Sequence, residues 1–221
     1  MQNIFKQLKN NWKKEGPFKM LHSINPVRLE YIYGSFYKHS KTKIEEATVL
    51  DLGCGGLIAS KALAKKAKKV YCIDEFISQE EKETASPNMI CKECKIENFE
   101  CDEKFDLIVS LEVIEHTDPF ALIEKASSLL KKDGILIIST INRTLRSAFG
   151  AIFLAEYILK LNPIGTHEYK GFVKPDEIKL IGMQNNLSTL DIKGMVPSFS
   201  KKWKLSENTN INYFITLKKD S

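Results

Sequence analysis

The sequence predicts an α/β protein built on a doubly wound, mainly parallel β-sheet. A mostly apolar run at 49–52 leads directly into the glycine-rich turn 53–56, and a second apolar run, 70–73, ends in the lone carboxylate of Asp74. Continuous apolar strands are typical of parallel sheets that helices cover on both faces. Glycines let the backbone approach a ligand, and an acid at the next strand end can accept hydrogen bonds from ribose hydroxyls. The pattern therefore favours a nucleoside-like cofactor.

The rest of the chain alternates between strand-like and helix-like segments. Apolar runs predict seven strands, near 48–52, 69–74, 88–93, 105–110, 134–140, 188–195 and 211–217. Helical spacing of apolar residues predicts helices at 2–14, 26–38, 57–67, 120–132 and 175–185, and a short polar helix is expected at 75–84. Pro26 is placed at the start of its helix, where the missing N–H costs least. We interpret 1–221 as one domain whose residues 1–40 form a helical cap.

The composition fits a globular protein that keeps its thiols reduced. The 221 residues are 43% apolar and 28% charged, enough for one sizeable core. Five cysteines form an odd set without a secretory signal, and Cys91-x-x-Cys94 followed by Cys101 lacks a fourth ligand at zinc spacing. The net charge of +5 comes mainly from dispersed lysines, which allows attraction to anionic surfaces. No basic stripe interleaved with aromatics accompanies it, so nucleic acid is not expected as a partner.

The turn after the first strand reads Asp51-x-Gly53-x-Gly55. The dinucleotide fingerprint G-x-G-x-x-G would need a third glycine at 58, where Ile58 stands, and no G-x-x-x-x-G-K-[ST] phosphate loop occurs. The motif resembles that of S-adenosylmethionine-dependent methyltransferases, in which the loop packs against the methionine part of the cofactor. The alternative is a tight strand-to-helix turn of the kind that any α/β protein can have.

A cluster of ionisable residues follows the strand at 105–110. Glu112 and Glu115 are three residues apart, so a helical turn would bring them to one face, with His116 adjacent. Two carboxylates and an imidazole suit a hard or borderline divalent cation. Alternatively, the acids complement the dipole of a helix start. Open α/β sheets bind ligands at the carboxyl ends of their strands, which is where this cluster is expected.

Four further blocks carry a more specific resemblance. They contain the strings L-H-x-I-N-P-x-R, N-R-T, A-E-Y and G-T-H, within residues 12–28, 139–144, 155–159 and 165–175. In this order they resemble the ubiquinone-biosynthesis O-methyltransferase family, the bacterial enzyme and its mitochondrial counterpart, from about Trp12 to Tyr213. The resemblance implies a class I methyltransferase fold, a Rossmann-like sheet of seven strands with the last strand antiparallel.

The resemblance also implies a binding site for S-adenosyl-L-methionine. Carried over by position, Arg28 would pair with the methionine carboxylate, a match that its planar fork suits. Gly53 would line the turn, Asp74 would bind the ribose, and Leu111 would lie beside the adenosine. Two departures from the family bear on this site. Leu57 stands where a third consecutive glycine is usual, and the helix after Asp74, which helps to wall the adenosine pocket, is contracted.

For the chemistry, the resemblance implies metal-assisted methylation of a phenol or catechol hydroxyl on a polyprenylated ubiquinone precursor. Glu112, Glu115 and His116 match the family's Mg2+ ligands. Phenolic hydroxyls have pKa values near ~10, and a divalent cation lowers the pKa of a hydroxyl bound to it. Without a metal, His116 or His167 could act as the general base, and the sequence does not choose between them.

Residues 141–172 are expected to form an apolar lid or to contact a membrane. The apolar run 148–159 is bracketed by Arg143, Arg146 and Lys160 and is shorter than the ~20 residues that a span needs. It suits an interfacial helix on an anionic membrane or a lid over an apolar cavity, and a buried core helix is the alternative. We therefore expect a bacterial cytoplasmic protein at the inner face of the inner membrane. Its expected partners are a polyprenylated phenol or quinol, and other ubiquinone-biosynthesis proteins are further candidates.

Two rival functions stay open from the sequence alone. One is methylation of a soluble phenol or carboxylate on the same fold. The other is a non-catalytic lipid-binding or assembly subunit that has lost the cofactor. Only 11 residues precede Trp12, too few for a mitochondrial presequence, so we expect the bacterial enzyme; if the sequence is a processed mature chain, a mitochondrial matrix enzyme remains the alternative.

Overall fold

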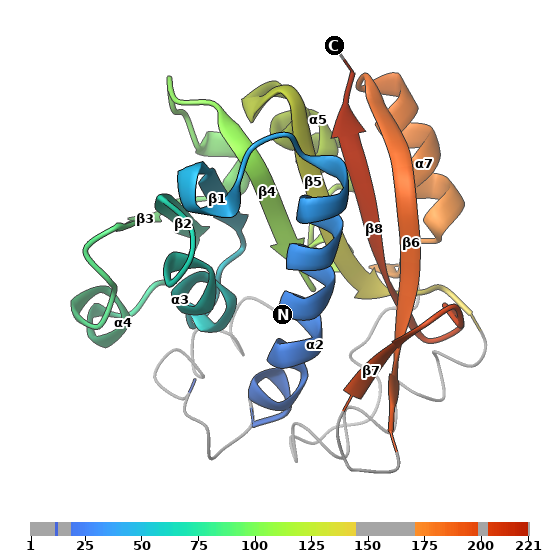
Figure 1. The fold of residues 1–221 in the computed structure, drawn as a ribbon, viewed down its shortest axis with the longest axis horizontal. Coiled ribbons are helices and arrows are strands. Elements are labelled where there is room, and N and C mark those ends of the chain that lie inside the picture. The colour runs from blue at the N-terminus through green and yellow to red at the C-terminus, as the bar shows by residue number, and fades with distance from the viewer. Residues whose placement is uncertain (1–11, 13–18, 145–170, 199–202, 221) are drawn as a thin grey trace.

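An eight-stranded sheet organises the part of the chain that this computed structural model describes, residues 12, 19–144, 171–198 and 203–220. Its strands lie in the order β3-β2-β1-β4-β5-β8-β6-β7 (Figure 1). Their bounds are β1 Thr48–Leu52, β2 Lys69–Asp74, β3 Met89–Glu93, β4 Phe105–Leu111, β5 Leu130–Ile141, β6 Leu187–Pro197, β7 Trp203–Ser206 and β8 Asn212–Lys219. Strands β1 to β5 pair in parallel, whereas β8 runs antiparallel to β5 and β6. The doubly wound α/β fold with an antiparallel last strand is thus confirmed.

The strand count exceeds the expected seven by one. The additional strand, β7, spans only four residues and lies at the edge of the sheet, antiparallel to β6. A short edge strand is paired on one side only, so neither length nor a continuous apolar run marks it in a sequence. The other seven strands coincide with predicted ones, although β5 begins at Leu130 rather than at 134.

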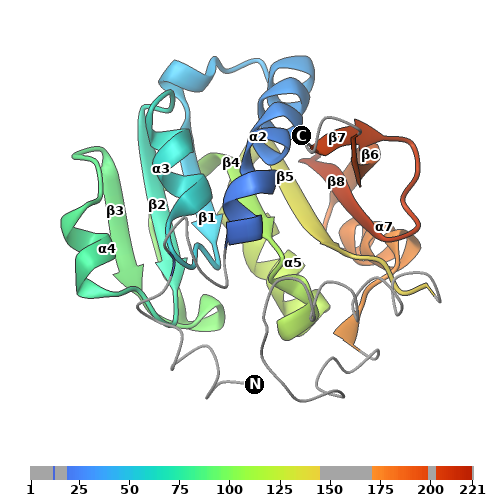
Figure 2. The same cartoon turned by 90° about the horizontal axis from the view of Figure 1, so that it is seen from below.

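Helices cover both faces of the sheet (Figure 2). They are α2 Lys19–His39, α3 Ile58–Ala64, α4 Gln79–Glu83, α5 Pro119–Leu129 and α7 Pro175–Gln184, with short 3-10 helices η1 Ile44–Glu46, η2 Ile96–Asn98 and η3 Ile114–His116. Successive residues of β1 pack into different clusters. Val49 packs in one cluster with Ile32 of α2 and Leu63 of α3. Leu50 packs in a second cluster with Ile123 of α5, as the alternating geometry of a strand buried on both sides requires.

The helix predicted at 26–38 begins earlier than expected, at Lys19. Pro26 lies inside α2 rather than at its start, so this boundary was wrong. Because proline has no N–H, the carbonyl of His22 has no i+4 donor within the helix. The helix continues past this point because apolar side chains on both sides of the proline, Ile24 and Val27, are buried in the core. Tertiary packing here outweighs the local preference that places proline in a first turn.

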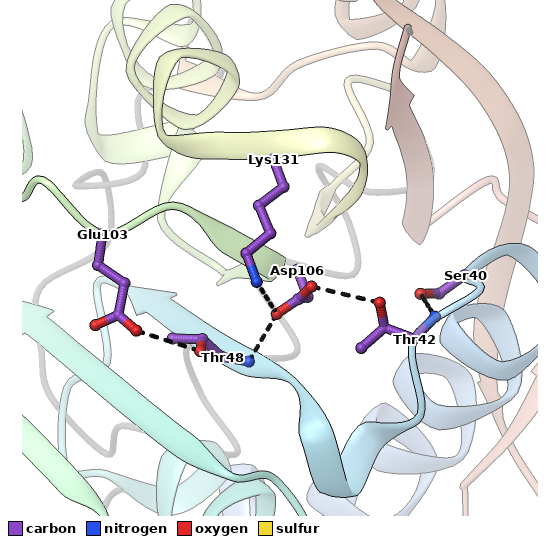
Figure 3. A network of polar contacts seen from close by, with 6 residues as sticks. All are labelled: Ser40, Thr42, Thr48, Glu103, Asp106 and Lys131. Carbon is purple, nitrogen blue, oxygen red and sulfur yellow. Dashed lines mark hydrogen bonds and ion pairs between the residues drawn. The ribbon is translucent and has the colours of Figure 1, made fainter.

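Polar contacts fasten the amino-terminal edge of the sheet (Figure 3). The buried carboxylate of Asp106 on β4 accepts hydrogen bonds from the Thr48 N–H at 2.9 Å and from Lys131 Nζ at 2.8 Å. Thr42 Oγ1 adds a longer bond to Asp106, and Thr48 Oγ1 donates to Glu103, both at 3.4 Å. Charge-assisted bonds of this kind compensate the burial of a carboxylate. They join β1, β4 and β5 at the edge opposite the glycine turn, so we assign this network to stability.

Several predicted features fall outside the described residues: helix 2–14 except for Trp12, Arg146, Lys160, His167 and most of the segment 141–172. Arg143 is among the described residues, and its Nη2 forms an ion pair with Glu177 in the first turn of α7. That pairing reduces the positive charge that Arg143 can offer to a membrane surface. Among the described helices, none is long and apolar enough to cross a membrane.

Candidate cofactor site

The carboxyl ends of three adjacent strands meet at one edge of the sheet (Figure 1). Because β1 lies between β2 and β4, the glycine turn after β1 has the last residue of β2, Asp74, on one side. On its other side lies Leu111, the last residue of β4. The chain leaves β1 toward β2 and returns to the other side of β1 at β4, and such a switch point is where open α/β sheets bind ligands. The structure therefore brings Gly53, Asp74 and Leu111 to one edge.

Two positive φ angles shape the turn after β1, 78° at Gly53 and 48° at Gly55. The Gly53 N–H donates to the carbonyl of Ile73 on β2 at 2.7 Å, which ties the turn to the neighbouring strand. A Cβ on Gly53 would lie 2.3 Å from Cγ2 of Val113. Both the backbone angle and the available space therefore exclude a side chain, and glycine lets the turn pack against the segment that follows β4.

Leu57 also adopts the left-handed conformation, with φ 58° and ψ 21°, at the residue before α3. This backbone costs a residue with a Cβ about 1–2 kcal/mol. The Leu57 side chain is fully buried in the core, and that burial offsets the strain. The turn thus keeps a glycine-like backbone at the position where this sequence has leucine.

Asp74 ends β2 with its carboxylate bound to the glycine turn. Its Oδ2 accepts from the Gly55 N–H and its Oδ1 accepts from the Phe76 N–H, each at 2.9 Å. Burial raises the pKa of Asp74, and these two N–H groups act against that rise. A carboxylate offers about four acceptor positions, so acceptor capacity remains for hydroxyl donors such as those of a ribose. The short helix expected after Asp74 is α4, which has only five residues.

Asp51, the first residue of the motif, has a role within the fold. Its buried carboxylate accepts a hydrogen bond from Ser60 Oγ of α3 at 2.5 Å. Burial raises the pKa of Asp51 to about 6, an effect larger than the opposing effect of the Ser60 hydrogen bond. Asp51 therefore joins β1 to α3 and fixes the glycine turn that lies between them.

Arg28 reaches the same edge of the sheet from α2. The side chain is only 5% exposed, and its Nη2 lies 3.4 Å from Oε1 of Glu112, the residue after β4. Its Nε and Nη2 atoms find no hydrogen-bond acceptor among the residues that the structure describes. Buried charged donors without acceptors cost free energy, so this guanidinium is suited to an additional anionic ligand. A carboxylate matches the planar fork of its N–H groups.

Glu112 and Glu115 are held by separate hydroxyl groups of β5. Ser139 Oγ donates to Glu112 Oε1 at 2.9 Å, and Thr140 Oγ1 donates to Glu115 Oε2 at 2.8 Å. Ser139 and Thr140 are successive residues of β5, so each carboxylate is held by a different hydroxyl group. Burial and, next, the charge of Glu112 raise the pKa of Glu115 to about 8.

The three predicted magnesium ligands do not share one helical face. Glu112 has a φ of 57°, and only Ile114–His116 form a 3-10 turn, so the expected face was wrong. In the described parts of the chain, no group of three or more His, Cys, Asp or Glu side chains is arranged to hold a metal ion. Glu112, Glu115 and His116 as placed here therefore do not fit a common Mg2+ ion.

The histidines differ in their placement. His116 is exposed at the end of η3, beside the acids. His22 Nε2 lies 2.8 Å from the carbonyl oxygen of Trp12, so it donates there as the Nε2–H tautomer and joins Trp12 to α2. His167 is outside the described residues. The choice of a general base between His116 and His167 therefore stays open.

Three residues at this edge were missed by the sequence analysis. Ser139 and Thr140 bind the two glutamates and lie near the carboxyl end of β5. Their position there is the feature that could have identified them from the sequence, because site residues gather at the carboxyl ends of strands.

Trp12 was noted only as the start of a family block, yet its indole lies against the glycine turn. A Cβ on Gly56 would come within 2.3 Å of Trp12 Cγ. No periodicity marks such a contact, because it joins segments far apart in the chain.

Comparison with known proteins identifies the family. A family model described as a methyltransferase domain matches residues 31–189. The ubiquinone biosynthesis O-methyltransferase of Pelagibacter ubique is 37% identical over 214 residues, covering 91% of this chain and 89% of the relative. The protein of the same name from Rickettsia prowazekii is 38% identical over 223 residues, covering 97% and 88%. The chain belongs to the ubiquinone biosynthesis O-methyltransferase family. The family resemblance seen in the sequence blocks is thus confirmed.

Solved structures share the fold of this family member at low sequence identity. Magnesium protoporphyrin IX methyltransferase from Synechocystis, solved with bound SAH, superposes with a TM-score of 0.67 at 17% identity over 99% of this chain and 100% of that chain. The N-methyltransferase NodS from Bradyrhizobium japonicum, in complex with S-adenosyl-L-homocysteine, gives 0.63 at 16% identity over 99% and 98%. At this identity the likeness establishes the methyltransferase fold.

Proposed function

We propose that the chain is an S-adenosylmethionine-dependent O-methyltransferase that methylates a phenol or catechol hydroxyl of a polyprenylated ubiquinone precursor. The observation that carries the cofactor assignment is Arg28, a buried guanidinium with two unsatisfied nitrogens beside the glycine turn. The names of the relatives, each a ubiquinone biosynthesis O-methyltransferase, support the reaction and the substrate class.

The residues at this edge suit the parts of such a cofactor. Arg28 would pair with the methionine carboxylate, and the turn at Gly53 would lie along the methionine chain. Asp74 would accept from the ribose hydroxyls, and Leu111, which packs partly buried against the core, would lie beside the adenosine. When bound, S-adenosylmethionine supplies an electrophilic methyl group on a sulfonium. The chain's main contribution is to align the substrate oxygen with that methyl group.

Proton removal from the substrate hydroxyl is the remaining chemical task. A histidine near neutral pKa is the usual general base, and His116 or His167 would take the proton as the oxygen accepts the methyl group. Metal assistance, which the family resemblance implies, is not part of this proposal. The carboxylates of Glu112 and Glu115 are bound by Ser139 and Thr140, and in the described parts of the chain they belong to no group of three or more side chains arranged to hold a metal.

We also propose a peripheral position at the inner face of the bacterial inner membrane. A polyprenyl tail partitions into lipid, so its enzyme must reach the bilayer surface. The segment 141–172 is the candidate contact, and other ubiquinone-biosynthesis proteins are candidate neighbours. Flotation with anionic liposomes at rising salt tests this, because screening weakens only the electrostatic part of the binding.

Two measurements test the proposed function. Isothermal titration with S-adenosylhomocysteine measures whether the site binds the cofactor product. Transfer of a labelled methyl group from S-adenosylmethionine measures whether a prenylated catechol is methylated. We expect saturable binding and transfer to the prenylated substrate. Absence of binding would favour a non-catalytic lipid-binding or assembly subunit. Transfer to tail-less catechols alone would favour a soluble substrate instead.

A further inference from the structure

The indole of Trp12 lies against the glycine turn of the cofactor site. A Cβ built on Gly55 would lie 2.8 Å from Trp12 Cη2, and one built on Gly56 would lie 2.3 Å from Cγ and 2.5 Å from Cβ of the same tryptophan. The ring therefore extends along both glycines, with its far end at Gly55 and its near end at Gly56. The short distances at Gly56 cannot be relieved by a small rotation of the tryptophan, because they involve Cβ and Cγ at the root of its side chain.

Gly56 shows that this contact, and not the backbone angle, demands a glycine. Its φ is not among the positive values that occur at Gly53 and Gly55. An alanine could adopt the Gly56 backbone, but its methyl group would collide with Trp12. At Gly56, therefore, glycine is required because the indole of Trp12 occupies the space that a side chain would need.

A hydrogen bond fixes Trp12 to the helix that carries Arg28. His22 Nε2 donates to the Trp12 carbonyl at 2.8 Å, and His22 and Arg28 both belong to α2. The same helix therefore positions the indole over the turn and the guanidinium beside it. Trp12 is partly buried at this position.

The contacts with Gly55 and Gly56 place Trp12 at the turn after β1, the central strand of the three that form the site. Asp74 lies on the β2 side of the turn, and the Arg28–Glu112 pair lies on the β4 side. If the ribose binds Asp74 and the methionine carboxylate binds Arg28, the sulfur that joins these two parts must pass over the turn of β1. Trp12 covers that turn. The face of an indole attracts cations, and a sulfonium is a cation whereas the thioether of the product is neutral.

We propose that Trp12 is a specificity-determining residue of the cofactor site, whose indole contacts the sulfonium and so favours S-adenosylmethionine over S-adenosylhomocysteine. This inference rests on the proposed function and deepens it. It gives the site a means of releasing the spent cofactor, because the attraction disappears when the positive charge leaves with the methyl group.

The test is calorimetric titration of both cofactor forms into Trp12→Leu, which keeps an apolar side chain but removes the aromatic ring. We expect the variant to lose about fivefold more affinity for S-adenosylmethionine than for S-adenosylhomocysteine, the size of one cation–π contact. Trp12→Phe should restore most of the preference. Trp203→Leu, on the edge strand β7, is the matched control and should leave the ratio of the two dissociation constants unchanged.

A second variant guards against misfolding of Trp12→Leu. Gly56→Ala leaves Trp12 in the chain but displaces its indole. It should therefore lower the preference for S-adenosylmethionine, measured as the Kd of S-adenosylhomocysteine divided by the Kd of S-adenosylmethionine. Adding Trp12→Leu should lower this ratio no further. Equal loss of affinity for both forms would show that Trp12 only shapes the turn and would overturn the inference while leaving the proposed function intact. Failure of the parent protein to bind either form would overturn both.

Discussion

Arg28 and Glu112 form an ion pair across the carboxyl end of β4, with 3.4 Å between Nη2 and Oε1. The guanidinium is 5% exposed and the glutamate side chain 26%, so the cation is buried and its partner is reached by solvent. Glu112 is itself fixed by Ser139 Oγ and by its own N–H, which donates to the Ser139 carbonyl at 2.9 Å. The pair holds the guanidinium in place and still leaves Nε and Nη2 without hydrogen-bond acceptors in the described structure. These unsatisfied nitrogens cost free energy in the ligand-free protein, and an anionic ligand that accepts from them would recover that cost.

We expect Arg28→Met to weaken both stability and binding, and the two effects are measured separately. Methionine fills similar apolar space, but Glu112 loses its ion pair and Asp51 and Glu115 lose a nearby cation, so the free energy of unfolding of the ligand-free protein should fall by ~1–3 kcal/mol. The affinity for S-adenosylhomocysteine should fall at least about tenfold, because a charge-assisted pair with the ligand is lost. Urea unfolding and calorimetric titration measure the two effects. Lys38→Met, at an exposed position of the same helix, is the control. Parental affinity in Arg28→Met would refute the assignment of this residue.

The arrangement of the acids predicts how the ligand-free protein responds to magnesium. Because Glu112 and Glu115 are bound to different hydroxyls and His116 is exposed, we expect no saturable Mg2+ binding in calorimetric titration. Glu115→Ala should then give the same flat titration as the parent protein. Binding in the parent that disappears in Glu115→Ala would instead show that the three residues converge on a metal, as the sequence resemblance implied.

Asp51 predicts a pH dependence of stability. Burial raises its pKa to about 6 in the folded state, above its ordinary value of 3.8, so the folded chain binds this proton more tightly than the unfolded chain. The contribution to stability is therefore fully present below about pH 4 and is lost as the pH rises through about 6, by up to about 3 kcal/mol.

Asp51→Asn tests this dependence, because asparagine keeps an oxygen for Ser60 Oγ but does not titrate. Relative to the parent, the variant should gain stability between pH 4.5 and pH 7.5, as measured by urea unfolding at both values. Asp102→Asn, at an exposed carboxylate, controls for the general loss of one negative charge. A constant difference between Asp51→Asn and the parent across this range would contradict the prediction.

The sequence sufficed where the signal is local. β1 and β2 have the predicted bounds because their apolar runs, fully buried in β1 and mostly buried in β2, end at glycine or at an acid. The placement of Gly53 and Asp74 at one edge follows from the order of parallel strands. By contrast, the edge strand β7 is too short to show a pattern, and α2 passes through Pro26 because packing overrides a local preference.

The contacts of the acids could not be read from spacing. A separation of three residues brings Glu112 and Glu115 together only if the backbone between them is helical, and the left-handed Glu112 breaks that condition. Which hydroxyl each acid meets depends on β5, far along the chain. The contact of Trp12 with the turn is of the same kind. The residue types were enough to locate the acids at the site, but their hydrogen-bond partners depend on the tertiary structure.

Leu57 offers a test of the strained turn. At an ordinary position glycine is less stable than alanine by roughly 0.5–1 kcal/mol, but at the φ of 58° found here the order should reverse. Both Leu57→Ala and Leu57→Gly lose a fully buried side chain, at ~2–5 kcal/mol, and only the glycine variant also recovers the ~1–2 kcal/mol of backbone strain. We therefore expect Leu57→Gly to be more stable than Leu57→Ala, and both to be less stable than the parent, in urea unfolding.

Leu63 of α3 is the matched control position, because it is also fully buried but lies within a helix. There the alanine variant should be more stable than the glycine variant. If alanine is the more stable at both positions, the left-handed backbone at Leu57 is not maintained in solution.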